Sequence, residues 1–155
     1  MHLGDFISPD SVIPSLKAKT KKQLLQELAS RAARLTGLPE RDIFDVLLQR
    51  ERLGSTGLGQ GIAIPHGKIA GLKGIAGIFA RLAEPIDFEA VDGEPVDIVF
   101  LLLAPEGAGA DHLKALARIS RLLREGSAVE KLRASKDAAA LYAVLTEGEA
   151  SSHAA

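Results

Sequence analysis

The stretch VDIVFLLL at residues 96–103 decides the fold, because it is apolar at nearly every position over the length of one strand. Such a run is typical of a central strand that is covered on both faces of its sheet. Shorter apolar runs at residues 62–64 and 75–82, the second ending before Pro85, predict further strands. Residues 11–13 are a candidate for one more short strand.

Helical patterns precede and follow these strands in the sequence. Thr20 and Gln23 have the spacing of a capping box, and Gly37 suits the end of that helix. Pro39 suits the start of a second helix, and Asp111 suits the cap of a third. The expected helices run from Thr20 to Gly37, from Pro39 to Gly54 and from Asp111 to Leu123, with shorter ones at residues 128–132 and 137–145.

Apolar side chains at helical spacing predict which helix faces are buried. The expected faces comprise Leu24, Leu28, Ala32 and Leu35, then Ile43, Val46 and Leu47, and then Leu113, Leu116, Ala117 and Leu123. Helices before and after a group of strands predict an α/β sandwich, a mixed sheet with helices on both faces. With 155 residues in all, we expect one domain over residues 1–147 and a disordered tail at residues 148–155.

Composition excludes several classes of function. Hydrophobic residues make up 46% of the chain and charged residues 25%, as in ordinary globular proteins, and the formal net charge is -1. Such a balance gives no support for binding nucleic acid or an anionic membrane. Cysteine is absent, which excludes disulfides, thiol catalysis and cysteine-based zinc sites. We recognise no signal peptide and no apolar run long enough to span a membrane, so a cytoplasmic protein is expected.

The segment GSTGLGQGIAIPHGK, residues 54–68, is rich in glycine but does not match a nucleotide-binding loop. A phosphate-binding P-loop needs a hydroxyl after its lysine, and Ile69 follows Lys68 here. The dinucleotide motif needs glycines in a different spacing, directly after a strand, whereas this segment follows a helix.

No metal site is expected, because His66 and His112 are the only internal histidines and no H-E-x-x-H motif occurs. A site of two histidines completed by carboxylates stays open as an alternative. No cofactor is expected.

His66 is the candidate reactive residue, although most histidines in mid-sequence are packed or exposed rather than catalytic. Pro65 restricts the backbone before it, and Gly67 allows a sharp turn after it that would leave the ring open to a partner. A neutral imidazole is a good nucleophile near neutral pH and can carry a phosphoryl group on nitrogen. Such a group requires cationic and N–H donors around it.

Two residues are candidates for those donors, each with an alternative. Arg50 extends the buried face of the second helix and could reach a phosphate, or it could simply be a favourable cation at a helix C-terminus. His112 follows a helix cap, so it is expected to be a neutral hydrogen-bonding neighbour, or else an exposed histidine of the first turn. Ser55 and Thr56 could donate hydroxyls to a phosphate, although loop and turn roles are equally compatible with their positions.

These residues resemble the active-site signature of EIIA domains of the phosphoenolpyruvate-dependent phosphotransferase system, of the fructose, mannitol and nitrogen-regulatory class. The likeness extends from the early helix to about Leu145 and includes LLQRERLGSTG before the histidine and PVDIVFLLLAPEGAGADHLKALARISRLLR after it. The resemblance implies a mixed sheet of about five strands flanked by helices. It is strongest to the nitrogen-regulatory branch in residues 47–68 and in the APEGAGADHL loop.

The resemblance also implies roles for residues and partners. His66 would accept a phosphoryl group through Nε2 from the phosphohistidine of an HPr-type carrier, with Arg50 and His112 stabilising it. Docking of the carrier would involve the remaining signature residues, namely Gly54, Ser55, Thr56, Gly57, Gly59, Gly61, Pro65 and Gly67. A nitrogen-regulatory member would bind targets such as potassium-transport or sensor-kinase proteins according to its phosphorylation. The alternatives are a sugar-specific EIIA that passes phosphate to an EIIB domain and a binding module that is not phosphorylated.

Overall fold

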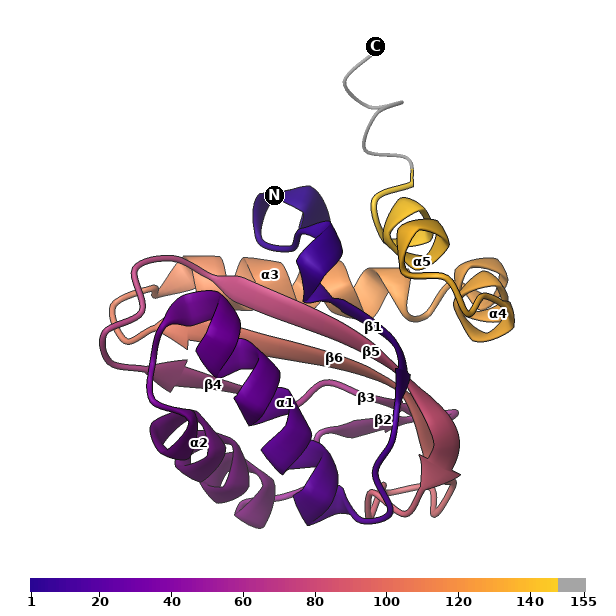
Figure 1. Cartoon of the computed structure of the whole chain (residues 1–155), viewed down its shortest axis with the longest axis horizontal. Helices are drawn as coiled ribbons and strands as arrows, with labels where there is room; N and C mark the ends of the chain where they lie inside the picture. Colours follow the sequence, from indigo (N-terminus) through magenta and orange to yellow (C-terminus); the bar gives the residue numbers. More distant parts are fainter. Residues whose placement is uncertain (148–155) are drawn as a thin grey trace, which may run out of the picture.

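Six strands form one mixed sheet in the computed structural model, which describes residues 1–147 (Figure 1). Their order is β1-β5-β6-β3-β2, and β4 pairs with β6 beside β3. The strands are β1 (Val12–Leu16), β2 (Gly57–Gly59), β3 (Ile62–Ala63), β4 (His66–Ile69), β5 (Ala76–Ile86) and β6 (Val96–Pro105). Strands β3 and β4 run parallel to β6, and β5 runs antiparallel to it. The tail expected at residues 148–155 lies outside the described residues.

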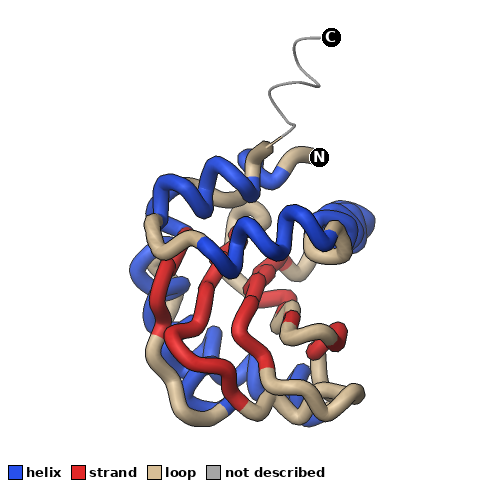
Figure 2. The backbone as a smooth tube through the Cα atoms, turned by 90° about the vertical axis from the view of Figure 1, so that its right-hand side faces the viewer, coloured by secondary structure: helices blue, strands red, loops and turns tan. Residues whose placement is uncertain are grey.

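Helices cover both faces of this sheet, which confirms the predicted α/β sandwich (Figures 1 and 2). One face carries α1 (Lys21–Thr36) and α2 (Glu40–Arg52). The other face carries α3 (Ala110–Leu122), α4 (Gly126–Ala134), α5 (Ala138–Leu145) and the short helix η1 (Leu3–Asp5). A second short helix, η2 (Pro9–Ser11), leads into β1.

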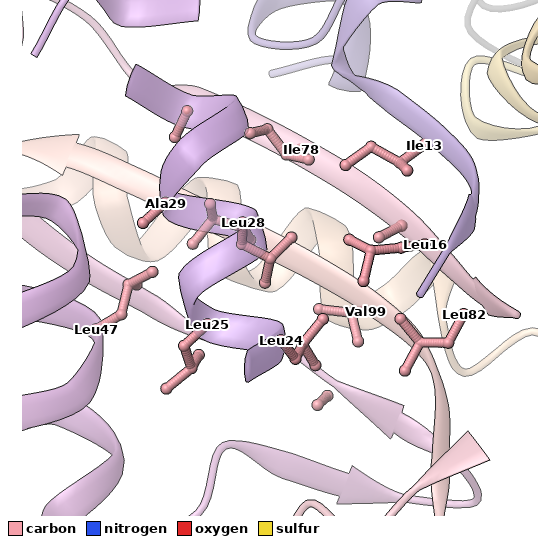
Figure 3. Close-up of a cluster of buried hydrophobic side chains, with 14 of the residues drawn as sticks. Ile13, Leu16, Leu24, Leu25, Leu28, Ala29, Leu47, Ile78, Leu82 and Val99 are labelled. Atoms are coloured by element: carbon pink, nitrogen blue, oxygen red, sulfur yellow. The ribbon is translucent and has the colours of Figure 1, made fainter. Parts of the chain in front are cut away.

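The central strand β6 builds both halves of the core. Its side chains alternate, so that Val99, Leu101 and Leu103 join the cluster under α1 and α2, whereas Ile98, Phe100 and Leu102 join the cluster under α3, α4 and α5. All six are buried. Figure 3 shows the first cluster, in which the leucines of α1 lie over Val99 and the neighbouring strands. The prediction of a central strand covered on both faces is confirmed.

Helix α1 begins and ends at the residues that the sequence predicted. The Thr20 hydroxyl oxygen accepts a hydrogen bond from the Gln23 backbone N–H at 3.1 Å, and Gly37 ends the helix at a φ of 77°. The Gln23 side chain accepts its bond from the Lys19 N–H rather than from Thr20, so only half of the predicted capping box forms.

The predicted buried face of α3 is confirmed at Leu123 and partly at Leu116, which packs against the core, but is wrong at Leu113 and Ala117. Leu113 is 68% exposed, and Ala117 is also exposed, whereas Leu123 is buried as expected. Helix α3 begins at Ala110 after Gly109, so Asp111 lies in the first turn and caps nothing. The buried side chains lie one position away from most of those predicted, and they are His112, Ala115, Ile119 and Leu122. One position is about 100° around a helix, which is enough to exchange a buried face for an exposed one.

Smaller corrections concern α1, β5 and the glycine-rich segment. Leu35 is 41% exposed, although the other predicted residues of α1 are buried. Strand β5 continues through Pro85 to Ile86, because the pairing with β6 is irregular between Arg81 and Ile86 and requires no N–H from proline there. Strands β2 and β4 lie where the sequence predicted only a loop, since their glycines hide the alternation typical of strands.

Candidate functional site

His66 is the first residue of β4 rather than part of a loop. It lies opposite Leu102 in the parallel pairing of β4 with β6, and the Leu102 N–H donates to the Pro65 carbonyl at 3.0 Å. Side chains at matched positions of neighbouring strands point to the same face of a sheet. Because Leu102 belongs to the cluster under α3, the His66 imidazole also points to the α3 face.

The backbone of the same segment fixes the His66 tautomer. Nδ1 lies 2.7 Å from the Ile64 carbonyl oxygen, which can only accept a hydrogen bond. Nδ1 of the neutral ring therefore carries the hydrogen, and the lone pair is on Nε2. His66 is half-buried, so a reactant can approach the ring. In the neutral ring, this arrangement leaves the Nε2 lone pair free to react.

The structure brings His112 to His66, as the resemblance implies. The ring centroids are 5.7 Å apart and the ring planes meet edge to face at 62°. Only 9% of His112 is exposed, which excludes the alternative of an exposed histidine of the first turn. Burial lowers the pKa of His112 below its ordinary value, with smaller effects from the charges of His66 and Lys68. The lowered pKa favours the neutral state expected for His112. Its Nε2 is buried without a hydrogen-bond partner among the described residues.

Arg50 does not hydrogen-bond to either imidazole within the described part of the chain. It lies in the last turn of α2, is half-buried, and donates from Nη1 to the Gly54 carbonyl at 2.9 Å. This contact satisfies a backbone oxygen that follows the helix, which is the role foreseen in the alternative of a helix C-terminal cation. The hydrogen bond also joins the helix to the start of the glycine-rich segment.

The hydroxyls of Ser55 and Thr56 are both used inside the protein. Ser55 Oγ donates to the Phe88 carbonyl at 3.2 Å and accepts from the Gly57 N–H at 3.1 Å. Thr56 is buried, and its Oγ1 donates to the Glu51 carboxylate at 2.5 Å. Both hydroxyls therefore stabilise the backbone of the glycine-rich segment and are not directed at a ligand in this structure.

Glu51 is a buried carboxylate that the sequence reading did not identify. It is 7% exposed, accepts the Thr56 N–H at 3.0 Å and pairs with Lys21 Nζ at 3.1 Å. Lys21 also lies 4.5 Å above the Phe88 ring centroid. An acidic residue in the last turn of a helix opposes the helix dipole, so Glu51 in the RER sequence was a signal that a specific partner holds it.

Close internal packing explains several of the signature glycines. A Cβ on Gly57 would lie 2.8 Å from the Ala90 Cβ, and one on Gly61 would lie 2.6 Å from Arg133 Nη2. A Cβ on Gly67 would lie 2.4 Å from Val46 Cγ1 of α2. Gly67 lies within β4 and makes no sharp turn, so the expected turn after His66 is wrong. Gly59, at a φ of 94°, occupies a backbone conformation that favours glycine.

No group of three or more histidine, aspartate or glutamate side chains in residues 1–147 is arranged to hold a metal ion. None of the helices in that range has both the length and the hydropathy that a membrane-spanning helix requires.

Comparison with known proteins reveals the family. A family model described as "Phosphoenolpyruvate-dependent sugar phosphotransferase system, EIIA 2" matches residues 5–148. The chain is 63% identical over 145 residues to a protein of Bradyrhizobium diazoefficiens named "Nitrogen regulatory protein", which covers 94% of this chain and 95% of the relative.

A solved structure and a more distant relative agree with this match. The nitrogen regulatory protein IIA-Ntr of Neisseria meningitidis superposes with a TM-score of 0.88 at 39% identity, covering 93% of this chain and 99% of that one. A Haloferax volcanii protein named "PTS system fructose-specific EIIA component" is 37% identical over 129 residues, 83% of this chain and 84% of the relative.

Proposed function

Because the chain belongs to the EIIA 2 family of the phosphoenolpyruvate-dependent sugar phosphotransferase system and is similar to its nitrogen regulatory proteins, we propose that it carries a phosphoryl group on His66. The group comes from the phosphohistidine of an HPr-type carrier. One observation carries the proposal most directly, namely the 2.7 Å contact of His66 Nδ1 with the Ile64 carbonyl, which leaves Nε2 as the nucleophile.

The transfer step exchanges one phosphorus–nitrogen bond for another. The Nε2 lone pair of His66 attacks the phosphorus atom in line, and the bond to the carrier's ring nitrogen breaks. The carrier leaves as a neutral imidazole because its other ring nitrogen carries a hydrogen. His66 keeps its hydrogen on Nδ1, so its phosphorylated ring is cationic beside the phosphate. No proton needs to move in this step, so catalysis rests on position and on the charges around the phosphate.

His112 and Arg50 are the proposed stabilising groups. A neutral His112 with its hydrogen on Nε2 would donate to a phosphoryl oxygen on His66, which would give the buried Nε2 the partner it lacks. Arg50 would exchange its bond to the Gly54 carbonyl for a bidentate contact with the phosphate. Both roles require the phosphorylated state.

Regulation follows from the charge that phosphorylation adds. A phosphoryl group brings about two negative charges to His66, enough to reverse a weak protein contact. We propose that the protein binds its regulatory targets, such as potassium-transport or sensor-kinase proteins, according to this charge. A sugar-specific role, with transfer to an EIIB domain, is the second candidate, since a relative at 37% identity is named as a fructose-specific EIIA component.

Intact mass spectrometry tests the proposal. The protein is incubated with phosphoenolpyruvate, Enzyme I and an HPr-type carrier, in parallel with His66→Ala and the control His2→Gln. We expect one acid-labile phosphoryl group on the wild type and the control, and none on His66→Ala. Absence of the group from the wild type, with a carrier shown to be charged, would leave an unphosphorylated binding module. Onward transfer to a fructose-type EIIB would select the sugar-specific role.

A further inference from the structure

A groove between α1 and β1 gathers positive charge on a part of the molecule that the phosphoryl site does not use. Its volume is about 390 Å³. We call it the basic groove; it is lined by Ile13, Ser15, Leu16, Lys17, Glu27, Arg31 and Arg34.

The cations of the basic groove lack carboxylate partners. None of Lys17, Arg31 and Arg34 forms an ion pair within residues 1–147, and Glu27 does not pair with Arg31 although it lies one helical turn before it. Arg31 makes one long hydrogen bond, 3.4 Å, to the Asp10 carbonyl. Three cations against one carboxylate leave a local excess of positive charge in a protein whose formal net charge is -1.

The groove also follows an open edge of the sheet. Strand β1 pairs only with β5 and ends the strand order, as Figure 1 shows. An edge strand offers backbone groups to an added segment, although Pro14 within β1 removes one N–H donor and protects the edge from extensive pairing. Ser15 and Lys17 are exposed along this edge.

We propose that the basic groove binds an extended acidic segment of a partner protein. Arg31 and Arg34, three residues apart on α1, would hold carboxylates of that segment, and Lys17 would add a third contact from the strand side. No aromatic side chain lines the groove, so it offers no stacking surface for a nucleotide base. The shape and the charges together favour an acidic chain segment over a nucleotide.

The position of the groove separates it from phosphoryl transfer. Strands β5 and β6 lie between β1 and β4, the strand that carries His66. The basic groove and His66 therefore lie on different sides of the two central strands, and no residue that lines the groove belongs to the candidate phosphoryl site.

A titration monitored by nuclear magnetic resonance tests the inference. Isotope-labelled full-length protein is titrated with a capped eight-residue peptide of alternating glutamate and serine. We expect shifts at residues of the groove, and affinity about tenfold weaker in Arg31→Glu/Arg34→Glu. The control Lys22→Glu/Arg41→Glu changes the net charge equally at exposed residues outside the groove and is expected to weaken binding less than twofold.

Other outcomes would overturn the inference. Equal weakening in both double variants would mean that the peptide responds to net charge alone. Tighter binding of inorganic tripolyphosphate at the same residues would indicate that the groove binds a small anion and not an acidic segment. If the double variant does not fold, Arg34→Gln at an exposed position replaces it, with about threefold weakening expected. Phosphoryl uptake at His66 is expected to be unchanged in Arg31→Glu/Arg34→Glu, which separates a failure here from a failure of the phosphocarrier proposal.

Discussion

At the scale of single residues, the candidate site contains two histidines with different surroundings. His66 is half-buried and held by a backbone carbonyl, whereas His112 is almost fully buried and its Nε2 has no hydrogen-bond partner among residues 1–147. Burial penalises a charged imidazole, so the pKa of His112 is lowered below its ordinary value. The pair therefore combines one ring suited to attack with one suited to receive a phosphoryl oxygen.

His112 predicts a pH dependence of stability. Its pKa is lowered in the folded protein, so the unfolded chain binds more protons between that lowered value and the ordinary histidine value of about 6.5. Stability from this group is complete above pH of about 6.5 and is lost as the pH falls through that window. Urea unfolding between pH 5 and 8 is expected to show a smaller loss for His112→Gln than for the wild type. An identical slope in both proteins would contradict this prediction.

At the scale of elements, the glycine-rich segment packs closely against neighbouring helices instead of forming an isolated loop. Glu51 joins α2 to Thr56 and, through Lys21, to the start of α1. Gly67 lets β4 approach α2 on the face opposite His66. The position of His66 thus depends on two helices that do not carry a reacting group.

Gly67→Ala is expected to destabilise the protein by about 1–2 kcal/mol, because the new Cβ would lie 2.4 Å from Val46 Cγ1. The same change in a Val46→Ala background is expected to cost less than about 0.5 kcal/mol, because the crowded methyl group is absent. Gly74→Ala is the matched control, since nothing lies within 4 Å of its Cβ. Chemical denaturation compares the wild type with the three single variants and the double variant, and additive costs would argue that crowding against Val46 is not the cause.

Glu51→Gln is expected to lower the free energy of unfolding by about 2–3 kcal/mol, because Lys21 loses its buried partner and Thr56 keeps only part of its anchor. Adding Lys21→Met is expected to recover part of that loss, since it removes the unpaired ammonium. Glu106→Gln, at an exposed loop position, is the control and is expected to change little. A loss for Glu51→Gln no larger than that of the control would show that the buried network contributes nothing.

The sequence predicted the elements whose signals are local. The run at residues 96–103, the Thr20 cap and the Gly37 stop each indicate their structure within a few residues, and the structure confirms them. It failed where the outcome depends on distant contacts. Strand β4 forms because β6 supplies its partner, and the buried face of α3 includes a histidine that hydrophobicity alone ranks as polar.

Part of the candidate site was predictable from local sequence signals, and part depended on distant contacts. His66 was identified from the glycine-rich signature and His112 from its position after a helix cap, and the fold brings the two rings together. The bond of Arg50 to Gly54 and the buried Glu51 were not predicted, because each depends on a backbone or side-chain partner whose position no local pattern gives.

At the scale of the whole molecule, the two sides of the central strands β5 and β6 carry different chemistry. One side holds the imidazoles of β4 and α3, and the other holds the cations beside β1. The formal net charge of -1 conceals this separation.

Phosphorylation is expected to change the behaviour of the whole molecule in an electric field. The phosphate carries about two negative charges, and the His66 ring gains one positive charge while Nδ1 keeps its hydrogen, so the formal net charge of -1 roughly doubles. Native electrophoresis at pH 8 is expected to separate the two forms into distinct bands, and acid treatment is expected to restore the slower one. His66→Ala should give only the slower band, and a shifted band from that variant would place the phosphate elsewhere.

The hydrogen bond between His66 Nδ1 and the Ile64 carbonyl has a consequence for protein engineering. Every residue type supplies the same carbonyl, so no point substitution at residue 64 deletes this acceptor. A designer who wished to move the reactive lone pair to the other ring nitrogen would have to reroute the chain around residues 64–66. A transplant of this site into another scaffold would equally have to copy its main-chain path, since copying the side chains alone would leave the choice of nitrogen undetermined.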